Sequence, residues 1–121
     1  MKKKTLHIGV RSLDQLEKET IAAFKRAEAS LPPIEPIYSL YFEDHNTLFS
    51  ALSPKRWELL RCLRKQGPMS IRKLAAELKR DYKNVYEDVQ QLSDLDLIKK
   101  KKDQTFFVPW DEITIQLALA A

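Results

Sequence analysis

The stretch SIRKLAAELKRDYKNVYEDVQQLSDLDLI, residues 70–98, decides the fold. Ser70 and Asp81 are residue types that cap helix N-termini, and apolar residues recur three and four positions apart after each of them. The pattern therefore predicts a short helix, a tight turn and a longer helix, with the small Ala75 where the two helices cross. The predicted seam between these helices consists of Leu74, Leu78, Val85, Val89 and Leu92.

Strand patterns follow this pair of helices. From Leu97 the apolar period changes to two, which is typical of strands. A hairpin is therefore expected, made of residues 98–102, the turn Asp103-Gln104 and residues 105–108. Residues 113–119 alternate in the same way, which favours a further strand over a helix.

Helices and strands are also expected on the N-terminal side. Ser53 and Pro54 start another helix, because a hydroxyl caps it and proline suits its first position, and Gly67 ends it. Ser12 and Gln15 have the spacing of a capping box. The other predicted elements are a strand at 6–10, a helix from 12 to about 30, an extended connector at 31–36, a strand at 37–42 and a short helix at 43–52.

The positive charge of the chain is concentrated in its second half. Residues 1–52 hold seven basic and seven acidic side chains, whereas residues 53–121 hold 14 and ten, which accounts for the net charge of +4. Residues 55–83 alone carry ten Lys or Arg against three Asp or Glu. This banding fits a protein that binds duplex nucleic acid, and solvated helix faces would give the same counts.

The helix that follows Asp81 is expected to present a polar face away from the seam. At about 100° per residue, the outward side chains are Arg80, Lys83, Glu87, Gln90 and Gln91, with Asn84 and Tyr86 on the flanks. Arg, Lys, Asn, Gln and Glu are able to read the donor and acceptor pattern of a DNA major groove. Tyr82 is expected either to pack in the seam or to reach a phosphate through its hydroxyl.

A run of four lysines falls in the predicted hairpin, namely Lys99, Lys100, Lys101 and Lys102. Alternation along a strand sends about half of them to one face, where two or three would reach phosphates. Such contacts position a protein on DNA without reading its sequence. The alternative is a hydrated hairpin tip.

Residues 70–98 resemble the helix-turn-helix of MarR-like winged-helix regulators, which has a leucine-alanine helix, a turn, a valine-centred recognition helix and a closing leucine-isoleucine pair. This likeness covers residues 53 to about 110. The whole chain also resembles small prokaryotic winged-helix proteins proposed as antitoxins of toxin–antitoxin modules. The segments that carry this second likeness are YFED at 41–44, LSPKR at 52–56, LLR at 59–61 and RDYKNV at 80–85.

The resemblance implies an α+β fold, a winged helix-turn-helix with an N-terminal strand-helix-strand extension. Residues 1–52 are expected to form the extension, for dimerisation or partner binding. Residues 53–121 are expected to form the DNA-binding domain together with the C-terminal strand. A homodimer built on the extension and on residues 113–119 would present two recognition helices about one DNA turn apart.

Two features depart from the MarR-like pattern. Lys79 and Asp96 stand where such regulators commonly have a glycine in the left-handed conformation. Glu87 and Asp88 place negative charge on the predicted recognition helix, close to where phosphates would lie. Glu87 indicates either a hydrogen bond from cytosine or weak DNA contact.

The remaining chemistry-bearing side chains are interpreted as structural. His7 and His45 have no Cys or carboxylate partner at ligand spacing, so we expect no metal site and no cofactor. Cys62, the single cysteine, forms no internal disulfide and is expected to act as a small buried hydrophobe. Gly9 and Gly67 alone make no glycine-rich phosphate loop, so no enzymatic activity is expected. No apolar run approaches membrane-spanning length, and a cytoplasmic location is expected.

Two functions are compatible with these patterns. The first is a small transcriptional regulator, an autoregulating antitoxin, that binds double-stranded DNA sequence-specifically. Its base contacts would come from Arg80, Lys83, Asn84, Glu87, Gln90 and Gln91, and its phosphate contacts from Tyr82 and the four hairpin lysines. The second is a protein–protein module that neutralises a partner, such as a toxin, and has little affinity for DNA.

Overall fold

The computed structural model describes residues 3–32 and 38–119, which divide into two compact units. Unit 1 comprises Met1–Leu48 and Asp111–Ala121, and unit 2 is Phe49–Trp110. The fold is α+β, and the described residues form five helices, a three-stranded parallel sheet and a two-stranded hairpin. The predicted division placed the C-terminal strand with residues 53–110, whereas that strand belongs to unit 1.

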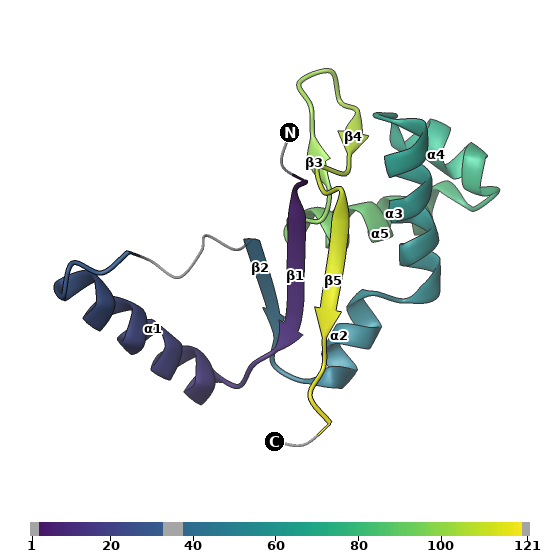
Figure 1. The fold of residues 1–121 in the computed structure, drawn as a ribbon. Helices are drawn as coiled ribbons and strands as arrows, with labels where there is room; N and C mark the ends of the chain where they lie inside the picture. The colour runs from purple at the N-terminus through teal and green to yellow at the C-terminus, as the bar shows by residue number, and fades with distance from the viewer. Residues whose placement is uncertain (1–2, 33–37, 120–121) are drawn as a thin grey trace. The chain divides into compact units, whose positions relative to one another are not determined.

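Unit 1 is built on a parallel sheet of order β2-β1-β5 (Figure 1). The strands are β1 (Thr5–Val10), β2 (Tyr38–Phe42) and β5 (Glu112–Gln116). Leu6 in the central strand stands opposite Tyr38 on one side and Ile113 on the other. Leu6 and Ile8 are buried and His7 is exposed, because successive side chains of a strand point to opposite faces.

Some predicted elements of unit 1 differ in extent from those observed. The strand expected at 113–119 ends at Gln116, and the following residues up to Leu119 have no regular structure. Residues 33–37, which include most of the predicted connector and Ile37, lie outside the described residues. The short helix predicted at 43–52 is α2 (His45–Ala51). Asp44 precedes it, and the hydrogen bonds that its carboxylate accepts from Thr47 lower the pKa of that carboxyl.

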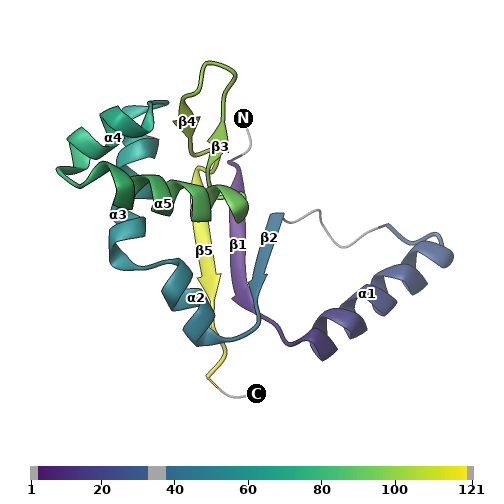
Figure 2. The same ribbon diagram turned by 180° about the vertical axis from the view of Figure 1, so that it is seen from behind.

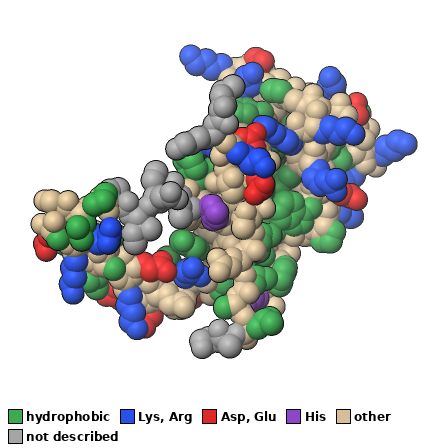
Figure 3. All heavy atoms as spheres, in the orientation of Figure 1, with side chains coloured by type: hydrophobic (Ala, Val, Ile, Leu, Met, Phe, Trp, Pro, Cys, Tyr) green, Lys and Arg blue, Asp and Glu red, His purple; other side chains and the backbone are tan. Residues whose placement is uncertain are grey.

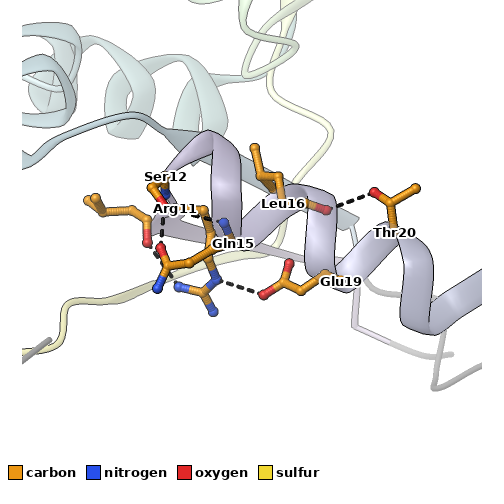
Figure 4. Close-up of polar contacts among 7 residues, drawn as sticks. Arg11, Ser12, Gln15, Leu16, Glu19 and Thr20 are labelled. Atoms are coloured by element: carbon orange, nitrogen blue, oxygen red, sulfur yellow. Dashed lines mark hydrogen bonds and ion pairs between the residues drawn. The ribbon is translucent and has the colours of Figure 1, made fainter.

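Helix α1 (Leu13–Glu28) begins with the predicted capping box, drawn in Figure 4. Ser12 Oγ accepts a hydrogen bond from the Gln15 N–H at 3.1 Å, and Gln15 Oε1 accepts one from the Ser12 N–H at 2.9 Å. In sequence, the apolar stripe of α1 consists of Leu13, Leu16, Thr20, Ala23, Phe24 and Ala27. The described part of the chain does not bury this stripe, since no residue of the helix is buried there. Leu13 and Phe24 are 74% and 65% exposed.

Unit 2 contains three helices and a hairpin (Figure 2). They are α3 (Pro54–Gln66), α4 (Ile71–Leu78), α5 (Tyr82–Asp94), β3 (Lys99–Lys100) and β4 (Phe106–Phe107). Ser53 and Ser70 cap α3 and α4 through their hydroxyls, as predicted. Asp81 occupies the N-cap position of α5, but its side chain makes no capping hydrogen bond.

The predicted seam forms the core of unit 2. Val85, Val89 and Leu92 of α5 have no exposed surface, and Leu74 of α4 is 1% exposed. Leu78 is only half-buried. Burial of each such aliphatic side chain contributes about 1.5–3 kcal/mol, so the core face fixes which side of α5 is turned outward.

The hairpin differs from the prediction in the position of its turn. Lys100 stands opposite Phe106, and the Lys101 N–H donates to the Thr105 carbonyl at 2.8 Å. The tip therefore has three residues, 102–104, and not the two expected at Asp103-Gln104. Gln104 takes a φ of 70°, because a three-residue hairpin loop ends in a left-handed residue.

Two residues without glycine's conformational freedom adopt left-handed backbone angles next to α5. Lys79, the C-cap of α4, has φ 54° and ψ 46°, and Asp96 has φ 61°. These are the two positions where the sequence departs from the glycine of MarR-like regulators. The Arg80 N–H then donates to the Ala75 carbonyl at 3.0 Å, which closes the end of α4.

Replacing Lys79 with glycine is expected to stabilise the protein by about 0.5–1 kcal/mol. The left-handed conformation costs about 1–2 kcal/mol in a residue with a Cβ, and the greater chain entropy of glycine offsets about 0.5–1 kcal/mol of that gain. Urea unfolding measures the change. Lys73→Gly, inside α4, is the matched control and should destabilise by about 1 kcal/mol. Equal losses at both positions would contradict the strain assigned to Lys79.

Candidate nucleic-acid interface

The outward face of α5 carries most of the predicted base-reading residues. The structure brings together the exposed side chains Lys83, Asn84, Glu87, Gln90 and Gln91 on this helix. The described residues provide no ion pair or side-chain hydrogen bond to any of the five. These donors and acceptors are therefore available to a ligand. The helix that carries them, α5, is held in place by the packing of its buried side.

Arg80 does not belong to this outward face, which corrects the prediction. Its Nη2 lies 2.7 Å from Asp88 Oδ2, and its side chain is only 17% exposed. Asp88 Oδ1 also pairs with Arg56 Nε at 3.0 Å. The helical period placed Arg80 outward, but the residue precedes the first turn of α5, where the backbone turns away from the helical path.

The three charged groups form a cluster, Arg56–Asp88–Arg80, that joins three segments of unit 2. Arg56 comes from α3, Arg80 from the turn after α4 and Asp88 from α5. Arg56 Nη1 also donates to the Ala51 carbonyl at 3.0 Å. Asp88 is therefore compensated by two guanidinium groups and lies half-buried in unit 2, whereas Glu87, the other carboxylate noted on this helix, stays exposed. The cluster positions α5 and leaves ligand contact to other residues.

The exposed face of α5 also includes an aromatic pair, Tyr82 and Tyr86. Their ring centroids are 6.3 Å apart, with an interplanar angle of 25°, and the residues are 51% and 45% exposed. Of the two alternatives for Tyr82, packing in the seam is wrong. Tyr86 was not among the predicted site residues, although its spacing of four from Tyr82 is a signal that two side chains meet on a helix surface.

Most basic side chains of unit 2 are free of ion pairs. Residues 49–110 hold 14 Lys or Arg and eight Asp or Glu, against seven and nine in the rest of the chain. Figure 3 shows Lys and Arg side chains spread over the visible face of this unit. Within the described ranges, the exposed cations without an ion pair include Lys55, Arg61, Lys65, Arg72, Lys73, Lys79 and Lys83.

The four hairpin lysines are not equivalent. Lys99 Nζ lies 3.4 Å from Asp96 Oδ1, and Lys100 Nζ lies 5.7 Å from the centre of the Phe106 ring. Lys101 and Lys102 are exposed, and no described carboxylate pairs with them. At the tip, hydrogen bonds from the Thr105 hydroxyl and N–H lower the pKa of Asp103. The hairpin thus presents two unpaired ammonium groups, one of them at the tip, and one tip carboxylate that accepts hydrogen bonds from Thr105.

Other sequence candidates lie away from this face. Cys62 of α3 is half-buried, and desolvation, reinforced by the charge of Glu77, raises the pKa of its thiol. His7 is in β1 and His45 in α2, and the described ranges hold no cluster of three side chains suited to a metal ion. None of the described helices combines the length and the apolar character that a bilayer crossing requires.

A match to a known protein family lies mostly on unit 2. Residues 51–115 match the model of a protein family described as HVO_A0114, and the match spans just over half of the chain. It includes α3, α4, α5, both hairpin strands and most of β5. No curated protein and no solved structure matches the chain.

Removing the carboxylate of the charged cluster is expected to destabilise the protein. Asp88→Ala leaves two largely buried guanidinium groups without their partner, which should lower the free energy of unfolding by about 2–4 kcal/mol. Urea unfolding followed by circular dichroism measures it. Asp94→Ala on the same helix, exposed and unpaired among the described residues, is the control and should change stability by less than about 0.5 kcal/mol. Similar effects of the two variants would refute the positioning role of Asp88.

Proposed function

We propose that this chain, which belongs to the HVO_A0114 family through residues 51–115, carries a MarR-like winged helix-turn-helix that binds double-stranded DNA in the part from α3 to β4. In this proposal α4 and α5 are the helix-turn-helix, α5 is the recognition helix and the hairpin is the wing. The order of three helices followed by an antiparallel hairpin supports it.

The observation that carries the proposal is the outward face of α5. A helix whose opposite side is fully buried presents one lysine, three amide side chains and a glutamate to solvent, all without intramolecular partners in the described residues. Such side chains match the donor and acceptor groups of base edges in the major groove. The unpaired cations of unit 2 supply the attraction to phosphates that every duplex-binding protein requires.

The residues have separate tasks in the complex. Base edges are contacted by Lys83, Asn84, Glu87, Gln90 and Gln91. Phosphates are contacted by Arg72, Lys73, Lys101 and Lys102. The Tyr82 hydroxyl adds one further phosphate contact. Arg80 acts through Asp88 as a positioning residue.

The protein acts in the cytoplasm as a transcriptional regulator, and its apolar α1 stripe joins two copies so that two recognition helices meet a palindromic site.

A second function, capture of a partner protein, is favoured by the exposed stripe of α1. Leu13, Ile21 and Phe24 are at least 49% exposed on one helix of unit 1. A 16-residue helix is marginally stable in water without packing of its apolar side, so the stripe requires a cover. An autoregulating antitoxin would use this helix on a toxin and α5 on its own operator. A protein with the partner function alone would bind no duplex in the experiments below.

Truncating a base-reading side chain should weaken only specific binding. Asn84→Ala is expected to cost about 1–3 kcal/mol on a duplex selected by the protein from a random library, and to leave binding to random duplex unchanged. Fluorescence anisotropy with both duplexes measures this. Asn46→Ala, on the exposed surface of α2, is the matched control and should change neither affinity. Equal losses on both duplexes after Asn84→Ala would show that Asn84 does not read bases.

Neutralising the free wing lysines should reduce the salt dependence of binding. The double variant Lys101→Gln, Lys102→Gln is expected to lower the log–log slope of affinity against salt by roughly 1.8, since each phosphate contact contributes about 0.9. The corresponding change in α1, Lys18→Gln with Lys25→Gln, should leave the slope as it is. If the unmodified protein shows no salt-sensitive affinity for any duplex, the proposed DNA binding is wrong.

A further inference from the structure

The aromatic pair Tyr82–Tyr86 lies outside the buried core of unit 2. The seam of α5 is completed by Val85, Val89 and Leu92, which are fully buried. The two rings stack on each other, and each residue has about half of its surface in solvent. Exposed aromatic side chains of this kind are enriched where a protein meets a ligand.

The charged side chains near this pair indicate which class of ligand it would contact. Lys83 lies between the two tyrosines in sequence, and the remaining unpaired cations of unit 2 favour a polyanion. Along the major groove of DNA, the apolar group that base pairs offer is the C5-methyl group of thymine. An apolar ring that enters this groove with the recognition helix therefore gains contact area only where a thymine stands.

We infer that Tyr82 and Tyr86 are specificity-determining residues that recognise the methyl groups of two thymines, an inference that rests on the proposed DNA binding. The centroid separation of 6.3 Å is close to two base-pair steps of about 3.4 Å each. The two recognised thymines are therefore separated by one base pair. The tyrosine hydroxyls add phosphate contacts, which carry no sequence information.

Replacement of thymine by uracil tests the inference, because it removes the methyl group and nothing else. The probe is the duplex that the full-length protein selects from a random library, with each thymine replaced singly by uracil. In each half-site of that duplex, two positions with one base pair between them should each show a Kd about four-fold weaker, the effect of losing one buried methyl group. The other thymines should show no change.

Protein variants separate the ring from the hydroxyl. Tyr82→Phe and Tyr86→Phe should keep the thymine-to-uracil difference, whereas Tyr82→Ala and Tyr86→Ala should each abolish it at one position of each half-site. Both residues are exposed, so circular dichroism spectra should be unchanged. The inference is overturned if uracil has no effect at any position, or if alanine and phenylalanine variants keep the same discrimination. Salt-sensitive binding that persists in that case leaves the proposed function standing, while loss of all duplex binding by the unmodified protein defeats both.

Discussion

The Asp88 carboxylate, held between Arg56 and Arg80, is the constraint on which the arrangement of unit 2 depends. The two ion pairs, at 3.0 and 2.7 Å, connect α3, the turn after α4 and the middle of α5. Apolar packing alone determines which side of α5 is buried, but it tolerates sliding and rotation, because the hydrophobic effect is non-directional. Paired guanidinium and carboxylate groups are directional, so they fix the helix at one angle and one depth.

Rigidity of this kind is what a base-reading surface requires. The side chains proposed to contact DNA are three amides, a glutamate, a lysine and two tyrosines, all carried by α5. Errors in the helix position would pass directly to the tips of these side chains. In the proposed complex, the compensated charges within unit 2 hold α5 in place, and the uncompensated ones on its surface attract phosphates.

Most of unit 2 was predictable from the sequence because its signals are local. Ser53 and Ser70 mark helix starts through hydroxyl caps, and the period of Val85, Val89 and Leu92 identifies the buried side of α5. Arg80 was misplaced because its partner Asp88 is a tertiary contact, which no periodicity reports. The tip of the hairpin was misplaced by one residue because Gln104 takes a left-handed conformation without being glycine. Tyr86 was placed on the flank of α5 and not among the site residues, although its spacing of four from Tyr82 indicated that the two rings would meet. Helix α1 and its cap were predicted correctly, but no residue of the described part of the chain buries its apolar stripe.

The topology of the sheet has a consequence for how the chain reaches its final form. Lys4 and Asp111, which join by a 2.7 Å hydrogen bond beside the β1–β5 pair, are 107 positions apart. Bringing such distant segments together costs more loop entropy than any contact inside unit 2, where neighbouring helices are joined by short turns. Folding of unit 2 reduces the effective length of the chain between Lys4 and Asp111. Strand pairing in unit 1 is therefore expected to be the late event in folding. During synthesis, β1 and β2 leave the ribosome long before β5, and β1 waits with one edge open until the C-terminal strand arrives.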